Sequence, residues 1–226
     1  SAVLRGYLDD SGWIAGWEPA GYMPAGLYGH QLAAARGRLY VRGGSRTAGS
    51  RSEVWAADVS STGAVGTWSA EAPLPDPVYF HAAAQAYGRI YVSGGYKSGS
   101  GVQKAVSYAA VGEDGALGPW TYAGDMEAPR YAHTLTLAAG RLYAAGGKDG
   151  SSARAEVWSR ELAADGSLTG SWTSFSSLPS PRYGHRTLAA GNRLYVVGGS
   201  NGQAAQASVF QSTVSASASS AAPWEA

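Results

Sequence analysis

Short apolar segments, each bounded by glycine or proline, follow one another along the whole chain. Between Met23 and Pro75 the pattern predicts strands near residues 30–35 and 39–41, a third strand near 54–55, and a fourth from Trp68 onward. Segments of this length with turn residues between them are typical of β-hairpins, whereas a helical period is absent. The pattern therefore predicts an all-β chain in which four short strands form one antiparallel sheet.

The same unit recurs along the chain at a fixed spacing. Successive tryptophans are separated by 51, 52, 52 and 52 residues, and histidines and glycine pairs keep the same register. The repeated positions are Trp17, Trp68, Trp120, Trp172 and Trp224; His30, His81, His133 and His185; and Gly43-Gly44, Gly94-Gly95, Gly146-Gly147 and Gly198-Gly199. A period of this length indicates stacked supersecondary units that bury their apolar faces against one another.

Turn and proline positions indicate how the strands are ordered within each sheet. Asp114-Gly115 and Asp165-Gly166 supply residues that tolerate positive φ between the third and fourth strands. Pro119 directly precedes Trp120, which is acceptable when the fourth strand is an exposed edge. The first strands are rich in alanine, at 33–35, 82–84 and 138–139. Small side chains there predict first strands that converge on a central axis, as in the blades of a β-propeller.

These motifs resemble the kelch family of β-propellers, in the form that the repeat takes in bacteria. The resemblance covers nearly the whole chain and is carried by Leu178-Pro179, Pro181-Arg182-Tyr183-Gly184-His185, the run 193–199 ending in Gly198-Gly199, and the turn 165–168 before Trp172. It implies four-stranded blades closed into a ring, with one blade completed by strands from both ends of the chain.

The blades can be assigned along the sequence. Residues 1–24 correspond to the third and fourth strands of a half blade, and the blades that follow are 25–75, 76–127, 128–179 and 180–226, the last truncated at its outer strand. Uncovered end faces would cost on the order of 10 kcal/mol each. The expected remedies are completion by another copy or continuation in a longer or split polypeptide; a compact four-bladed ring is a third arrangement.

Composition narrows the chemistry. The chain has no cysteine, a formal net charge of +1 and a charged fraction of 15%, and it lacks an apolar run long enough to span a bilayer. Thiolate chemistry is excluded, and neither membrane insertion nor nucleic-acid binding is expected, because no dense basic stripe occurs.

Catalysis is not expected either. The histidines occupy one repeated position, whereas a catalytic site needs an asymmetric group of residues, so we expect them to bond neighbouring backbone groups. The acidic residues at 9–10 and 113–114 suit hairpin turns better than calcium loops, and Gly146-Gly147-Lys148 lacks the hydroxyl residue and helix of a phosphate loop. No metal or cofactor is predicted. Some kelch relatives are copper oxidases or sugar mutarotases, so a sugar-modifying enzyme is an alternative reading.

The favoured interpretation is a non-catalytic binding module for a protein or an acidic glycan. The loops between strands two and three differ between units, as a recognition surface requires. The resemblance to kelch rings implies that these loops share one face with the blade junctions. We expect this loop face to be net positive. Its candidate ligand residues are Arg46, Arg51, Tyr96, Lys97, Lys104, Arg130, Lys148, Arg154 and Arg182. The alternative is a structural subunit of an assembly. An extracellular or cell-surface location is expected from family habit, the absence of thiols and the serine- and alanine-rich tail 212–222.

Overall fold

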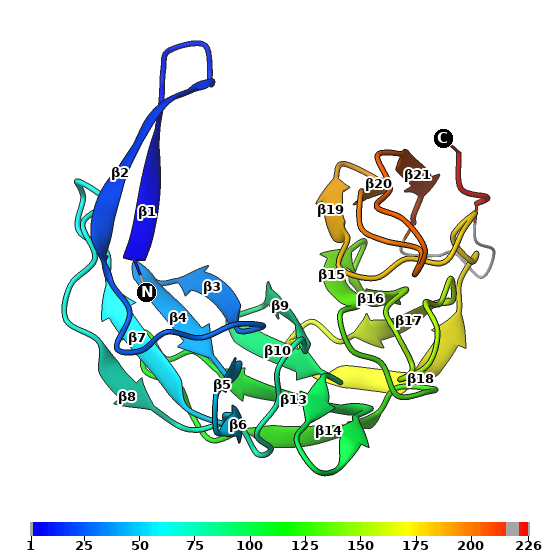
Figure 1. Cartoon of the computed structure of the whole chain (residues 1–226), viewed down its shortest axis with the longest axis horizontal. Coiled ribbons are helices and arrows are strands. Elements are labelled where there is room, and N and C mark those ends of the chain that lie inside the picture. The colour runs from blue at the N-terminus through cyan, green and yellow to red at the C-terminus, as the bar shows by residue number, and fades with distance from the viewer. Residues whose placement is uncertain (1, 216–221, 226) are drawn as a thin grey trace.

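The computed structural model describes residues 2–215 and 222–225, and within them it contains β-strands and no helix. It follows that no described segment is a helix capable of crossing a bilayer. The sheets follow one another along an open arc (Figure 1), and residues on the inner side of the arc line a hollow. The predicted all-β class of antiparallel four-stranded sheets is confirmed. Part of the serine- and alanine-rich tail, residues 216–221, lies outside the described residues, as do residues 1 and 226.

The strands form one hairpin and four blades, which we number I to IV. The hairpin is β1 (Ala2–Leu8) and β2 (Ile14–Tyr22). Blade I is β3 (Gln31–Ala35), β4 (Arg38–Arg42), β7 (Val54–Asp58) and β8 (Ser69–Glu71). Blade II is β9 (Ala82–Ala86), β10 (Arg89–Ser93), β13 (Ala105–Ala110) and β14 (Thr121–Asp125).

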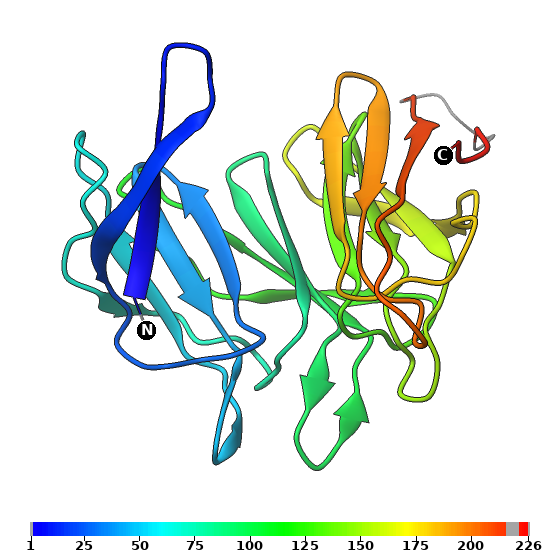
Figure 2. The same cartoon turned by 45° about the horizontal axis from the view of Figure 1, so that its top comes forward.

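Blade III is β15 (Thr134–Ala138), β16 (Arg141–Ala145), β17 (Val157–Leu162) and β18 (Leu168–Ser174). Blade IV is β19 (Arg186–Ala190), β20 (Arg193–Val197) and β21 (Val209–Thr213), and a single bridge from Gln211 to Glu225 marks the expected fourth strand. Two loops contain small ribbons, β5–β6 (Ser45–Arg46, Gly49–Ser50) and β11–β12 (Tyr96–Lys97, Gly101–Val102). Ribbon β5–β6 and hairpin β1–β2 project to opposite sides of the array (Figure 2).

Strand order within each blade follows the prediction. The first strands β3, β9, β15 and β19 face the hollow, and neighbouring first strands contact one another. Fourth strands β8, β14 and β18 are the outer edges. Pro119 therefore lies just before an edge strand, where its missing N–H removes no hydrogen bond from the sheet. The small residues of the first strands allow the blades to converge.

The repeated glycine pair is explained by close contacts at the end of each second strand. A Cβ on Gly94 would lie 2.3 Å from the carbonyl oxygen of Arg130 and 2.9 Å from Cε1 of His133, and Gly94 has a φ of 56°. A Cβ on Gly95 would lie 2.9 Å from Cβ of His81. The first glycine thus accommodates the histidine of the next blade, and the second glycine accommodates the histidine of its own blade. Other residues would clash as well as adopt a strained backbone.

The core consists of apolar clusters between neighbouring blades. One cluster joins Tyr143 and Val157 of blade III to Leu194 and Phe210 of blade IV. The five repeated tryptophans differ in their burial. Trp172 and Trp224 are buried, Trp68 and Trp120 are half-buried, and Trp17 is 63% exposed. The indole N–H of Trp120 donates to the carbonyl of Ala72 in blade I, and that of Trp224 donates to the carbonyl of Ser176 in blade III, so these two tryptophans are held against the preceding blade.

Apolar side chains are exposed at both arms of the arc. Val54, Val106 and Val157 occupy one position of the third strands and are at most 1% exposed, whereas the equivalent Val209 of blade IV is 46% exposed. Hairpin β1–β2 also carries exposed Leu4, Leu8, Trp13, Ile14 and Trp17. Each blade covers the preceding face, and the described residues provide no such cover for blade IV.

Candidate axial binding site

A chain of backbone hydrogen bonds links the blades at the mouth of the hollow. The amide of Phe80 donates to the carbonyl of Gly29 (2.7 Å), Ala132 donates to Phe80 (2.7 Å), and Gly184 donates to Ala132 (2.8 Å). Each of these residues directly precedes the repeated histidine and has a positive φ, between 51° and 64°. We call this chain of bonds the axial ring. It fixes the start of every first strand around one centre.

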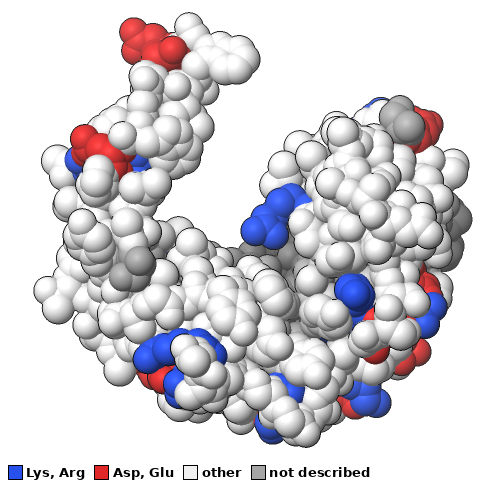
Figure 3. All heavy atoms as spheres, in the orientation of Figure 1, with Lys and Arg blue, Asp and Glu red and all other residues white. Residues whose placement is uncertain are grey.

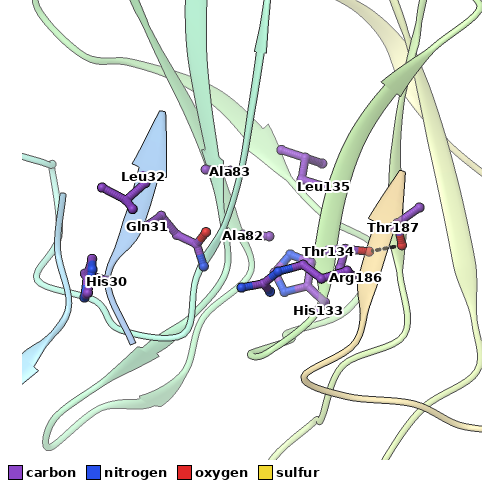
Figure 4. A pocket seen from close by; sticks show the side chains of 10 residues that line it. All are labelled: His30, Gln31, Leu32, Ala82, Ala83, His133, Thr134, Leu135, Arg186 and Thr187. Carbon is purple, nitrogen blue, oxygen red and sulfur yellow. Dashed lines mark hydrogen bonds between the residues drawn. The ribbon is translucent and has the colours of Figure 1, made fainter. Parts of the chain in front are cut away.

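The axial ring frames an open cavity. This axial cavity has a volume of about 420 Å³ and is lined by residues of all four first strands (Figure 4). Its lining residues are His30, Gln31, Leu32, Ala82, Ala83, His133, Thr134, Leu135, Arg186 and Thr187. A second hollow of about 310 Å³ shares His30, Gln31, His133 and Arg186 and adds Phe80 at the mouth. The site thus combines a hollow large enough for a side chain with a mostly polar lining.

Arg186 supplies the positive charge of the axial cavity. Its side chain reaches toward the centre, near the side chains of Gln31 and His133 (Figure 4). The guanidinium is exposed and forms no ion pair with another described residue. At the equivalent position the other blades carry Gln31, Ala82 and Thr134, so blade IV alone places a cation here. A free guanidinium in a concave site favours a carboxylate or another planar anion.

Aromatic rings form a platform beside the mouth. Phe80 lies 5.2 Å from Tyr79, 6.1 Å from Tyr28 and 6.4 Å from Tyr131, measured between ring centroids. Tyr96 from ribbon β11–β12 closes the group at 5.5 Å from Tyr79. Phe80 has a φ of 51° where two other blades have glycine and one has alanine, and its side chain is 38% exposed. An exposed bulky residue in a strained conformation favours a functional role over a packing role.

The predicted cations of the loop face are largely paired with acids. Most of the surface in Figure 3 is uncharged, and blue and red side chains lie next to one another along the rim. The pairs are Arg46–Glu53 (3.9 Å), Lys97–Asp76 (2.6 Å), Lys104–Asp125 (3.0 Å), Arg130–Glu156 (3.3 Å) and Arg154–Asp149. Hydrogen bonds from residues 151 and 152 and from Arg154 also hold the pKa of Asp149 well below its usual range. Because most of these cations are paired with acids, the structure gives little support to the expectation that the loop face is net positive.

Two of the predicted ligand residues are corrected by their burial. Arg130 is 3% exposed and its guanidinium lies 4.7 Å from the ring of Trp158. Arg182 is 1% exposed, donates to the carbonyl of Gly198 and the hydroxyl of Ser208, and lies 4.5 Å from the ring of Phe210. Both side chains fasten a blade junction to the next sheet, so neither can contact a ligand at the surface.

The remaining predicted ligand residues lie outside the axial cavity. Lys148 packs over the ring of Tyr183 at 5.1 Å, and Arg51 is half-buried with its Nε unpaired among the described residues. Tyr96 is the one that joins the site, through the aromatic platform. Arg186, Gln31 and Phe80 were not among the predicted ligand residues. Each is larger than the small residues that other blades carry at the same repeated position, and this difference is the sequence signal that could have identified them.

Two of the repeated histidines, His133 and His185, bond to side chains of the preceding blade. Nε2 of His133 lies 2.9 Å from the hydroxyl of Ser93, and Nε2 of His185 lies 3.3 Å from the hydroxyl of Thr134. The predicted partners were backbone groups, whereas His133 and His185 bond side-chain hydroxyls. Burial lowers the pKa of His81 and His133 to about 3 and that of His185 to about 4. No group of three or more His, Asp or Glu residues suited to a metal occurs in the described part of the chain.

Four-stranded antiparallel blades, linked in an arc by an axial ring, define a repeat protein built from propeller-type blades. A kelch motif matches residues 181–214. Over 138 residues, 58% of this chain, the sequence is 32% identical to alpha-scruin of Limulus polyphemus, and over 172 residues, 76% of this chain, it is 28% identical to Kelch-like protein 26 of Danio rerio. These regions span 14% and 27% of the two relatives. These matches support the similarity to kelch-repeat proteins that the motifs predicted.

Proposed function

We propose that this chain is a non-catalytic kelch module that binds a partner protein, and that it receives an acidic side chain of the partner in the axial cavity. The kelch relatives support protein binding as the general role. The observation that carries the acidic specificity is the unpaired guanidinium of Arg186 inside a cavity of about 420 Å³. A carboxylate would gain charge-assisted hydrogen bonds there.

The aromatic platform supplies the second half of the site. Phe80 is 38% exposed and lies at the mouth through which a partner would reach Arg186, and Tyr28 is 54% exposed with its ring centroid 6.1 Å from that of Phe80. An apolar side chain next to the carboxylate would cover these rings, which is the anchoring arrangement of many protein interfaces. The cations of the loop face that are paired with acids then contribute more to shape and solubility than to binding affinity.

Peptide arrays test the proposal. The probes are short acidic peptides with an apolar residue beside the Glu, each compared with its Glu→Gln counterpart. We expect binding of the acidic set, and a loss of about tenfold or more in R186S, since a hydrogen bond to a charged group contributes about 1.5–3 kcal/mol. R193S is the matched control, because Arg193 bonds Gln211 away from the cavity and its removal changes net charge equally.

Specific results of the peptide array would contradict the proposal. Equal binding of Glu and Gln peptides, or unchanged binding by R186S, would overturn the acidic specificity. Acidic oligosaccharides form a separate arm, and their selective binding in place of peptides would assign the site to a glycan. F80G separates function from folding, because glycine suits the φ of 51° at this position while the ring contact is removed.

Assembly between copies is a second candidate function, and the exposed apolar face of blade IV favours it. Val209 is 46% exposed and Leu188 is 59% exposed on this blade. If the face associates with another copy, the mass in solution exceeds that of one chain and falls in V209K. A monomer mass at all concentrations, in both proteins, would exclude this second function.

A further inference from the structure

Arg42 is a buried cation at a position where the other blades have small or apolar residues. It is the last residue of β4 and is 1% exposed. The equivalent residues of blades II, III and IV are Ser93, Ala145 and Val197. A guanidinium at this depth requires compensation, because an isolated charge in a protein interior costs several kcal/mol.

No protein group provides that compensation within the described residues. Arg42 forms no ion pair, and its Nε and Nη1 atoms have no hydrogen-bond partner. Burial lowers the pKa of Arg42 to about 10, and no carboxylate acts to restore it. Even at this value the side chain remains positively charged at neutral pH. Glu53, in the loop that follows β4, pairs with Arg46 instead.

His81 of blade II adds a second unpartnered group at the same place. Arg42 and His81 occupy the positions that Ser93 and His133 occupy one blade further, and there the two side chains are 2.9 Å apart. His81 is 1% exposed, and both of its ring nitrogens lack a partner among the described residues. The neutral imidazole still has one N–H to donate. Two buried donor groups therefore face each other across the interface of blades I and II without an acceptor.

We propose that Arg42 and His81 bind a small monovalent anion, of the size and charge of chloride, between blades I and II. Such an anion offers an acceptor to both groups and neutralises the guanidinium. A larger anion does not suit the neighbourhood, because a Cβ on adjacent Gly43 would already lie 2.6 Å from the carbonyl of Val78 and 2.8 Å from Cε1 of His81. The bound anion would fix blade I on blade II at the base of the loop that carries β5–β6.

Thermal unfolding of the whole chain in sodium chloride and in sodium gluconate, at equal ionic strength, tests this site. Gluconate is too large to enter. In the unaltered protein we expect the Tm to rise with chloride by about 3–5 °C for each tenfold increase above the Kd, and to stay constant in gluconate. R42S introduces the residue found in blade II and should abolish the chloride effect. R193S removes an exposed cation that bonds Gln211 away from this site, and it should keep the effect.

A crystal grown in sodium bromide gives an independent readout on the unaltered protein. Anomalous scattering should show one bromide beside Arg42 and His81. The proposal is overturned if that density is absent, or if chloride and gluconate raise the Tm equally. A chloride effect that persists in R42S would place the anion elsewhere and would also overturn it.

Discussion

The hydroxyl of Tyr91 in blade II donates to the carbonyl oxygen of Gly166 in blade III, at 2.5 Å. The same bond joins Tyr40 of blade I to Gly115 of blade II, also at 2.5 Å. Each tyrosine comes from a second strand, and each acceptor lies in the turn between the third and fourth strands of the next blade. The sequence repeat thus produces the same hydrogen bond at two successive interfaces between blades.

Loss of this hydroxyl should weaken the array without disturbing its packing. We expect Y91F to lower the free energy of unfolding by about 1 kcal/mol, the usual value of one buried hydrogen bond. Tyr195 has no such bond among the described residues, so Y195F should change stability by a few tenths of a kcal/mol at most. Urea unfolding measures both, and equal effects of the two variants would disprove the assignment.

High pH should destabilise the protein through the same tyrosine. Burial raises the pKa of Tyr91 to about 12 from an ordinary value of 10.0. The unfolded chain therefore releases the proton first, and stability that is complete below pH 10 is lost as the pH rises toward 12. The slope from this residue should reach about 1.4 kcal/mol per pH unit. Unfolding at several alkaline pH values, compared between the unaltered protein and Y91F, should show a smaller slope in the variant.

Low pH should destabilise the protein through the repeated histidines. Burial lowers the pKa of His81 and His133 to about 3 and that of His185 to about 4, whereas the unfolded residues titrate near 6.5. The unfolded state binds more protons below pH 6.5, so stability present above that pH is lost as the pH falls toward 4. Each residue contributes about 1.4 kcal/mol per pH unit.

One variant isolates a single histidine. H133Q removes the titrating group and leaves an amide that can bond Ser93, so the acid slope should fall by the share of one residue, about 1.4 kcal/mol per pH unit. Stability that is flat between pH 6 and pH 4 in the unaltered protein would show that the imidazoles are not buried as described.

The stability lost when the first glycine of a pair is replaced by alanine should depend on whether another blade follows it. A Cβ at Gly94 would lie 2.3 Å from the carbonyl of Arg130, so G94A should cost about 3 kcal/mol or more. Gly198 has a similar φ of 65°, but a Cβ there would meet nothing closer than 3.5 Å. G198A should therefore cost about 1–2 kcal/mol, from backbone strain alone. If both variants lose the same stability, the clash with the next blade is refuted.

Strand order within the sheets could be predicted because it depends on features that recur. The alanines of the first strands and Pro119 each leave a repeated or positional signal in the sequence. Their consequences follow from backbone geometry within one or two units, and the structure shows them as expected. The glycine pairs also recur in the sequence, but the histidine contacts that require them appear only in the structure.

The candidate site could not be predicted in the same way, because it is made of exceptions to the repeat. Arg186, Phe80 and Gln31 come from different blades, and the axial ring brings them together. Conversely, arginine is usually found at the surface, yet Arg130 and Arg182 are buried against the rings of Trp158 and Phe210. Pairing of loop cations with acids also depends on which side chains can reach one another between neighbouring loops. The number of charges in each loop does not predict this.

The most direct test of the account is amide hydrogen exchange at Phe80, Ala132 and Gly184. These residues lie outside the strands, but their amides form the axial ring that holds the blades around one centre. We predict that all three exchange as slowly as the amides of strands β10 and β16. Exchange as fast as that of the exposed loop residues 98–100 would contradict the axial arrangement and the binding site that depends on it.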